Sequence, residues 1–388
     1  MTCTGFYRRC TSKWIEGIVV LVALGSAVAA QAADRIVLRN LKILTDRTVS
    51  GLDEDGVRLD DGSVLGWDEV EKGKVADSQQ ADFDRYLTEV GEPLYRIRQR
   101  LSVGDYRGLL PHAEAIYARY ADRDSPAAYM VAQALMWARL ASGRREESLD
   151  PYLRCLEYVR RHPGAENALP GQRHLACDPA TGLAKELLPV WFDEQAAGKA
   201  IPAAFAAITR MRKPRPDGVN IYFATLALTA GQVDSANRVL SAMTATTPEL
   251  GNLREIVESQ RDMQAGRADQ VIQRLSPRWA GYDESSKPVA LYWLGTARTR
   301  SADVSQRQAG LLDLLRIPAI YGTSQPDLAA AALYRSMQVL SELKDLRGSV
   351  AVRKELLEKY PHTSFAERVA PGASSEAAPD SGADKETP

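Results

Sequence analysis

The densest cluster of side chains that could do chemistry lies near residue 55. Three acidic residues at 53–55 precede Gly56, and two more at 60–61 precede Gly62. Carboxylates on a tight loop could bind a hard cation such as Ca²⁺. With Gly56 at the sixth position of an EF-hand loop, however, the first and twelfth ligands would be Gly51 and Gly62, which carry no side-chain oxygen. Hairpin turns explain the cluster better, because Asp-Gly pairs accept the backbone geometry of tight turns.

Histidine, cysteine and serine could supply metal ligands or nucleophiles. The sequence contains neither H-E-x-x-H nor C-x-x-C, and no two histidines have metal-ligand spacing. It also lacks the G-x-S-x-G nucleophile elbow and the G-x-x-x-x-G-K-[ST] phosphate loop. We therefore predict no catalytic, cofactor-binding or metal-binding residues, and no enzymatic activity. The histidines are His112, His162, His174 and His362.

The first 32 residues have the composition of an export signal. Basic residues between positions 8 and 13 precede an apolar run at 18–30, and Ala30-Gln31-Ala32 has the form that a signal peptidase cuts. The run is shorter than the roughly 20 residues needed to cross a bilayer. We expect residues 1–32 to be removed and the protein to reach the periplasm or cell envelope; the sequence leaves periplasmic and fully secreted forms open.

Charge and cysteine content narrow the classes of partner. The chain has 49 basic and 50 acidic side chains, of which three basic and one acidic lie in the expected signal, so the rest has a net charge of about −3. This balance gives no general field for nucleic acid or an anionic membrane, although it does not exclude local patches. After signal removal only Cys155 and Cys177 remain, in a compartment that permits disulfides. The sequence is compatible with a bridge between them and with two separate thiols.

Residues 34–76 differ from everything that follows. Short runs rich in Val, Ile and Leu alternate with polar residues, and Asp55-Gly56 and Asp61-Gly62 stand between the runs. Asp-Gly flanked by strand-forming residues is a strong hairpin signal. This segment is predicted to be a small β module of about four strands.

Beyond Gln80 the apolar residues follow a helical period. Seven of them between residues 106 and 120 recur at steps of three and one, which places them on one face of a helix. A helix with one apolar face must bury that face against a neighbour. These residues are Tyr106, Leu109, Leu110, Ala113, Ile116, Tyr117 and Tyr120.

One junction recurs along the helical part: a helix ends at a small residue, a few polar residues follow, and another helix begins. Glycine suits this position because its left-handed conformation ends a helix at no steric cost. Three of the four intervals between copies are 33 to 39 residues long, close to the length of a helix-turn-helix repeat. The fourth holds an irregular insert at about 162–180. The predicted repeat-turn residues are Gly104, Gly143, Gly198, Gly231 and Gly266.

Two stretches resemble a known family. Residues 355–364, ELLEKYPHTS, are similar to the repeat endings of bacterial envelope tetratricopeptide proteins, in which proline closes the second helix. Leu294-Gly295 matches the leucine-glycine pair in the first helix of such repeats. The chain over about 82–368 therefore resembles the tetratricopeptide repeat (TPR) family, with degenerate copies. The resemblance implies a solenoid of helix hairpins that binds a protein or peptide in a groove.

Aromatic residues recur on the first helices of the expected hairpins. In a solenoid these helices line the concave face, where aromatic side chains suit a peptide. Packing between repeats is the alternative explanation for the same residues. The candidate groove aromatics are Tyr129, Tyr222, Tyr292 and Tyr334.

The sequence thus predicts a mainly α fold with a small all-β module before a TPR-like α-solenoid. The expected organisation is a signal peptide at 1–32, the β module at 34–76, the solenoid at 80–368 and a disordered tail at 371–388, which has no large apolar side chain. The expected function is a non-catalytic scaffold that binds a protein or peptide in the cell envelope, without nucleic acid, cofactor or integral membrane segment. The alternatives are a structural envelope component with an empty groove and an envelope enzyme acting on glycan.

Overall fold

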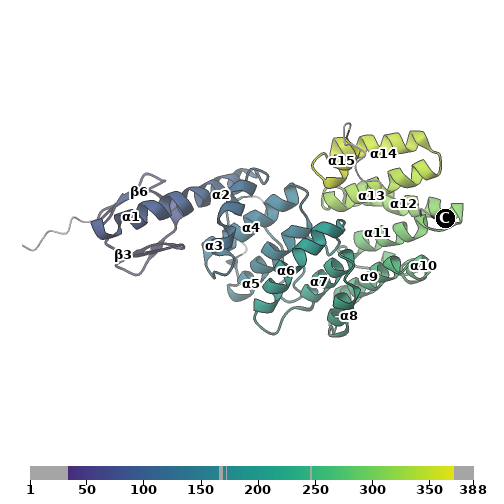
Figure 1. Cartoon of the computed structure of the whole chain (residues 1–388), viewed down its shortest axis with the longest axis horizontal. Coiled ribbons are helices and arrows are strands. Elements are labelled where there is room, and N and C mark those ends of the chain that lie inside the picture. The colour runs from purple at the N-terminus through teal and green to yellow at the C-terminus, as the bar shows by residue number, and fades with distance from the viewer. Residues whose placement is uncertain (1–33, 166–168, 172, 245–246, 371–388) are drawn as a thin grey trace, which may run out of the picture. The chain divides into compact units, whose positions relative to one another are not determined.

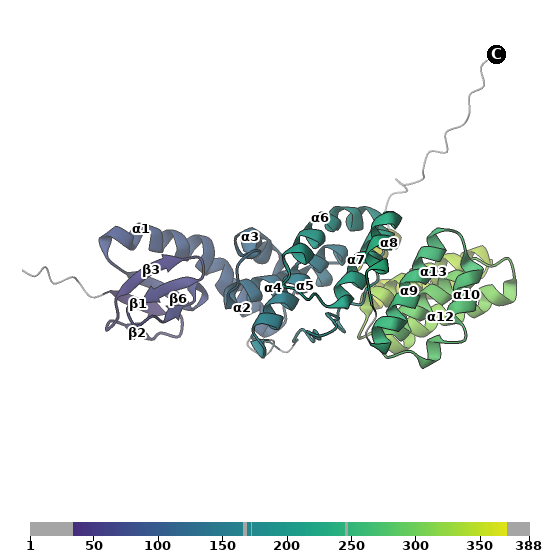
Figure 2. The same cartoon turned by 90° about the horizontal axis from the view of Figure 1, so that it is seen from below.

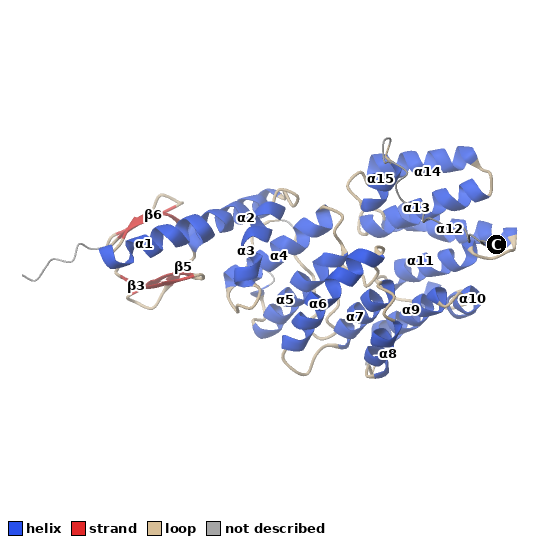
Figure 3. Cartoon of the chain, viewed as in Figure 1, coloured by secondary structure: helices blue, strands red, loops and turns tan. Residues whose placement is uncertain are grey.

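The computed structural model describes residues 34–165, 169–171, 173–244 and 247–370. The expected signal at 1–32 and the expected tail at 371–388 lie outside these residues. The protein is mainly helical, with a small N-terminal all-β module of two antiparallel sheets (Figures 1 and 3). The chain divides into two compact units, Met1–Thr88 and Glu89–Pro388, which are described separately.

The β module contains two three-stranded sheets, with strand orders β2-β1-β6 and β3-β4-β5. Gly62 has a φ of 82° in the turn between β4 and β5, as the Asp-Gly signal predicts. The structure assigns six strands within the described residues, more than the four expected, because β2 and β5 are two residues long and leave no alternating pattern. The strands, partly labelled in Figure 2, are β1 (Arg35–Leu38), β2 (Ile43–Leu44), β3 (Val49–Asp53), β4 (Gly56–Leu59), β5 (Val64–Leu65) and β6 (Val70–Lys74).

Helix α1 (Asp77–Tyr86) belongs to the same compact unit as the strands. Its Phe83 is fully buried, and its ring lies so close to Gly73 that a Cβ there would come within 2.6 Å of it. The ring centroid of Trp67, also buried, lies 5.5 Å from those of both Phe83 and Tyr86. The first unit therefore extends past the strands to Thr88, whereas the sequence placed the end of the β module at residue 76.

The second unit consists of helices, most of which pack against the next helix in the chain. Alternate helices also touch, since α2 contacts α4, α7 contacts α9, and α11 contacts both α9 and α13. The helices are α2 (Glu92–Val103), α3 (Leu110–Tyr120), α4 (Pro126–Ala141), α5 (Leu149–Arg161), α6 (Glu194–Arg210), α7 (Asp217–Thr229), α8 (Val233–Ser241), α9 (Pro248–Gln264), α10 (Ala268–Leu275), α11 (Ser286–Thr299), α12 (Val304–Tyr321), α13 (Pro326–Glu342), α14 (Leu346–Lys359) and α15 (Ser364–Val369).

Four of the five predicted turn glycines have a left-handed backbone conformation, at the end of a helix or just after it. Their φ values lie between 69° and 74°, at Gly104, Gly143, Gly231 and Gly266. The prediction for Gly198 is wrong, because this residue lies inside α6. The carboxylate of Asp193 accepts the N–H of Ala196 and starts α6 five residues earlier, and the alanine-rich sequence that follows keeps the helix intact through the glycine.

Contacts between residues far apart in the sequence bring the last helices of the second unit back to its middle. Arg145, between α4 and α5, forms an ion pair of 3.1 Å with Asp327 at the start of α13. Arg368 of α15 forms a 3.1 Å ion pair with Asp193. Among the described residues, no helix is both long enough and apolar enough to span a bilayer.

Candidate functional site

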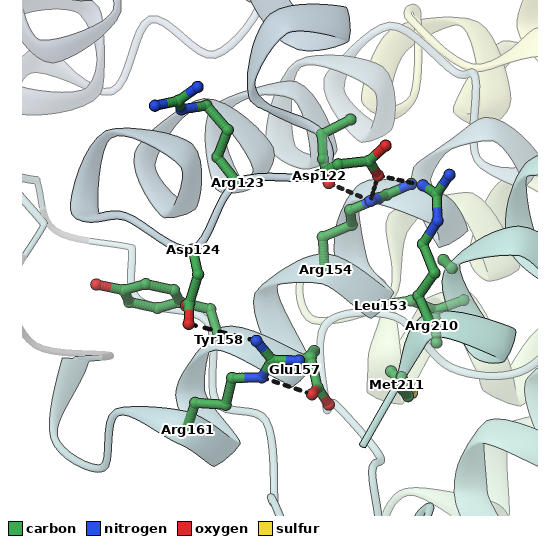
Figure 4. Close-up of a pocket in the computed structure, with 12 residues that line it drawn as sticks. Asp122, Arg123, Asp124, Leu153, Arg154, Glu157, Tyr158, Arg161, Arg210 and Met211 are labelled. Carbon is green, nitrogen blue, oxygen red and sulfur yellow. Dashed lines mark hydrogen bonds and ion pairs between the residues drawn. The ribbon is translucent and has the colours of Figure 1, made fainter. Parts of the chain in front are cut away.

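One pocket in the second unit is lined mainly by charged side chains, and we call it the Arg154 pocket after its central residue. It encloses about 120 Å³ between the end of α3, α5 and α6. Asp122 lies between Arg154 and Arg210, as Figure 4 shows, and accepts from the guanidinium of Arg154 at 2.7 Å. Arg161 lies between Asp124, at 3.3 Å, and Glu157, at 2.8 Å.

In the Arg154 pocket, arginines and carboxylates of the protein pair with one another. Arg154 also binds Asp150 at 3.2 Å, and Asp150 accepts the hydroxyl of Tyr117 at 2.6 Å. Burial alone would raise the pKa of Asp124, but hydrogen bonds from His162 and Arg161 outweigh it and lower that pKa. Such a network ties three helices together and offers a ligand few unmatched groups.

A second cavity lies among α7, α9, α11 and α13, and we call it the Gln260 cavity. It encloses about 290 Å³ and combines an aromatic wall with amide, hydroxyl and guanidinium groups. Mixed linings of this kind are typical of binding sites, in which aromatic area supplies affinity and a few polar groups fix orientation. Its lining residues are Trp191, Phe192, Glu194, Thr229, Gln260, Gln264, Tyr292, Trp293, Thr296, Arg300 and Arg335.

The segment before α6 supplies two of the aromatic side chains and is held in place by buried charges. Arg145, 4% exposed, donates to the carbonyl oxygens of Leu188 at 2.8 Å and Val190 at 3.0 Å. Glu146, also 4% exposed, accepts the N–H of Phe192 at 2.8 Å. Because charged groups anchor its backbone, Phe192 is fixed at the cavity even though no helix or strand contains it.

Three polar atoms at the Gln260 cavity have no hydrogen-bond partner within the described residues. The amide nitrogen of Gln260 donates to the carbonyl oxygen of Thr225 at 3.2 Å and to Thr229 at 3.0 Å, which leaves its Oε1 unpaired. Thr296 Oγ1 and Arg335 Nε are also unpaired. Gln260 is only 1% exposed, and an unpaired polar group at such a site costs about 1–3 kcal/mol. The atoms themselves expose almost no surface, so a ligand would supply the missing partners only after these side chains shift.

Tyr292 links the aromatic and cationic sides of the cavity. Its ring centroid lies 5.6 Å from that of Phe192 and 5.4 Å from that of Trp293. Burial raises the pKa of Tyr292 to about 12, against the opposing effect of the guanidinium groups of Arg335 and Arg300. The phenol therefore stays protonated at neutral pH and can donate a hydrogen bond.

The four predicted groove aromatics have different surroundings. Tyr292 lines the Gln260 cavity, whereas Tyr334 is half-buried and packs on Phe365 of α15, with ring centroids 5.4 Å apart. Tyr129 and Tyr222 are 2% and 0% exposed, so their assignment to a groove is wrong. Tyr129 stacks on Tyr158 of α5, and Tyr222 donates to the carbonyl oxygen of Leu187 at 2.5 Å. Both are packing residues, which was the alternative explanation.

A third cavity, of about 260 Å³, contains a carboxylate with a perturbed pKa. Burial and the nearby Asp283 and Asp178 raise the pKa of Glu249 at the start of α9. The two aspartates already accept hydrogen bonds from backbone N–H groups that shape the adjacent turns. Within the described part of the chain, no hydrogen bond of this kind reaches the carboxylate of Glu249.

The two cysteines of the possible disulfide and the histidines are not among the residues that line the Gln260 cavity. Cys155 is buried on α5 and Cys177 is half-buried in the loop before α6. No disulfide joins them, so the structure has the two separate thiols that the sequence also allowed, and burial and the neighbouring Cys177 raise the pKa of the Cys155 thiol. His162 contacts Asp124 at 2.9 Å, while His112, His174 and His362 lie elsewhere on the second unit.

Sequence reasoning missed Phe192, Gln260 and Thr296. Gln260 follows Leu253, Ile256 and Val257 at helical spacing, so a glutamine in an otherwise buried register was the available signal. Comparison of the chain with protein-family models, with curated proteins and with solved structures found no match. The candidate site therefore rests on its geometry alone.

Proposed function

We propose that the protein is a non-catalytic exported scaffold that binds a protein or peptide at the Gln260 cavity. The observation that carries this proposal is the set of unpaired polar atoms on Gln260, Thr296 and Arg335 beside an aromatic wall. An extended peptide offers alternating N–H and C=O groups, which match orphaned acceptors and donors, and side chains that can cover aromatic rings.

The proposal includes an α-solenoid of TPR-like hairpins, with α7, α9, α11 and α13 on the ligand-binding side. Contacts between these alternate helices, and the left-handed glycines at the turns between paired helices, support that arrangement. The expected cell-envelope location follows from the signal-like sequence at 1–32. A structural envelope role with an empty cavity is the alternative that the binding experiment tests.

The test is selection of peptides from a displayed library on the immobilised chain 33–388, followed by titration calorimetry. Trp293→Ala should weaken a selected peptide about 30-fold, as loss of an aromatic anchor does. Thr296→Val should weaken it about fivefold, the effect of one hydrogen bond. Arg210→Ala, in the Arg154 pocket, is the control and should leave affinity unchanged. Peptides that bind all four proteins equally, or no selected peptide at all, would count against the cavity as the binding site.

An enzyme acting on envelope glycan is a second candidate, and the raised pKa of Glu249 favours it. A carboxyl group that holds its proton can act as a general acid at a glycosidic bond. The measurement is the clearing of a peptidoglycan suspension by the chain 33–388 and by Glu249→Gln. Clearing by the first protein and none by the second would support this candidate over the scaffold.

A further inference from the structure

Strands β2, β1 and β6, labelled in Figure 2, form a sheet whose solvent side carries an unusual set of residues. Along β1, Ile36 and Leu38 are buried, so Arg35 and Val37 point to the opposite side of the sheet. Residues directly opposite one another on antiparallel strands share a side. Lys74 lies opposite Arg35, and Lys72 and Ile43 lie opposite Val37. We call this set the basic sheet face: Arg35, Val37, Ile43, Lys72 and Lys74.

The positive charges on this face are not matched by the module itself. Arg35 and Lys74 are like charges in directly opposite positions, an arrangement that destabilises a sheet. Within the part of the chain that the structure describes, neither they nor Lys72 form an ion pair, and the same holds for Lys42 in the adjacent turn. The acidic Glu71 of β6 is paired with Arg39 at 3.1 Å. Four cations without an ion pair to any described residue are therefore gathered here, on a chain whose overall charge is close to zero.

The turn beside the basic sheet face exposes large apolar side chains. Leu41 is 82% exposed and Ile43 is 46% exposed. Leu41 has a φ of 68°, a left-handed conformation that glycine or asparagine adopts far more readily than leucine. A glycine at this position would relieve the backbone and remove the apolar exposure together, so folding does not explain the leucine.

Lysines on an edge strand also prevent a sheet from pairing with another sheet, and Lys72 and Lys74 lie on such a strand. That role explains the charges of β6 but neither the arginine opposite them nor the exposed Leu41. Cations beside a protruding apolar tip instead match the chemistry of a lipid surface, where the charges lie at anionic headgroups and the apolar side chains enter the acyl boundary.

We propose that the basic sheet face, with Lys42 and Leu41 at its tip, docks peripherally on an anionic bilayer. Its contacts are the headgroup phosphates for Arg35, Lys42, Lys72 and Lys74 and the upper acyl region for Leu41. The docking needs no ligand at the Gln260 cavity, so it stands independently of the function proposed above. It would hold the β module at a membrane while leaving the helical unit to bind its own partner.

The experiment is co-sedimentation of the chain 33–388 with vesicles of phosphatidylglycerol and phosphatidylcholine, compared with vesicles of phosphatidylcholine alone. Binding should need the anionic lipid and fall with salt, because exposed charges are screened. Lys72→Glu with Lys74→Glu should reduce the bound fraction about tenfold or more, given the charge each lysine contributes near a surface. Lys354→Glu with Lys359→Glu, both exposed on α14 of the other unit, is the matched charge control and should bind like the unmodified chain.

Leu41→Gly separates docking from folding. It should raise the thermal midpoint of the β module, because glycine fits the left-handed turn, yet lower vesicle binding about fivefold by removing the apolar insertion. The proposal is overturned by equal binding to both vesicle types, by no binding to either, or by Leu41→Gly binding as well as the unmodified chain. Loss on charge reversal with no effect of Leu41→Gly would indicate a soluble polyanion instead of a bilayer and would also overturn it.

Discussion

The Arg154 pocket and the Gln260 cavity both contain arginine and carboxylate side chains, but they differ in whether the polar atoms around them have hydrogen-bond partners. In the Arg154 pocket the carboxylates of Asp122, Asp124 and Glu157 each accept from an arginine of the same pocket. In the Gln260 cavity, polar atoms of Gln260 and Thr296 have no partner within the described residues. Charge density alone is therefore a poor guide to a binding site, and unpaired atoms beside aromatic area are a better one.

The largest expected effect comes from removing a charge in the Arg154 pocket, where the carboxylates are already paired. Arg154 is 16% exposed and binds both Asp122 and Asp150, so Arg154→Ala should lower the free energy of unfolding by about 2–3 kcal/mol. Urea unfolding followed by circular dichroism measures this. Arg210 also pairs with Asp122, but its side chain is 57% exposed. Arg210→Ala should therefore lower the free energy of unfolding by less than about 1 kcal/mol. Equal losses for the two variants would contradict the idea of a buried network centred on Arg154.

A smaller effect compares two threonines near the Gln260 cavity. Thr225 Oγ1 accepts the indole N–H of Trp191 at 2.8 Å, so Thr225→Val leaves a buried donor unpaired and should destabilise the fold by about 1–2 kcal/mol. Thr296 Oγ1 has no partner within the described residues, so Thr296→Val removes an unpaired polar group and should raise the free energy of unfolding by about 1 kcal/mol. Thermal unfolding of both variants tests the contrast. A large loss in Thr296→Val would show that its hydroxyl is already satisfied inside the fold.

The smallest expected effect concerns pH. The folded protein lowers the pKa of Asp124, so the stability from this carboxylate is present above its unfolded pKa, about 3.9, and is lost as pH falls through the folded pKa. Asp124→Asn should therefore lose less stability than the unmodified chain between neutral pH and about pH 3.

Glu249 gives the control of opposite sign. Its pKa is raised, so its contribution is present at low pH and is lost as pH rises through the folded pKa. As pH rises through the folded pKa of Glu249, the unmodified chain should lose stability and Glu249→Gln should lose less. Asp124→Asn should have no effect in that pH range. Unfolding midpoints in urea across the pH range measure both variants, and profiles that coincide would refute the assigned shifts.

Local patterns in the sequence predicted most of the fold. The apolar face drawn from residues 106–120 is confirmed in part, since Leu109, Ala113, Ile116 and Tyr120 are buried. Helix ends were found where a glycine coincides with a left-handed backbone, and the one failure, at Gly198, came from a glycine that sits inside an alanine-rich helix. A glycine alone cannot distinguish those two cases, because they differ in where the helix begins, and Asp193 caps α6 ahead of the glycine.

The candidate site was harder to predict because its residues come from distant segments. Tyr292 was found from its recurrence on an expected helix, but Phe192 reaches the cavity only through the backbone anchors of Arg145 and Glu146. The unpaired state of Gln260 depends on where Thr225 and Thr229 lie on another helix. The sequence carries no local mark of such an arrangement, so only the assembled structure separates these residues from ordinary core positions.

The ion pair of Arg145 with Asp327 also sets an order of assembly. The two residues are 182 positions apart, and the same guanidinium holds the segment that presents Phe192 to the cavity. During synthesis Arg145 leaves the ribosome long before its partner, and contacts of such high sequence separation form late. The lining of the Gln260 cavity is thus incomplete until α13 has been made. A chain cut short before residue 327 would lack Asp327 and α13, and with them the Arg335 side of the Gln260 cavity.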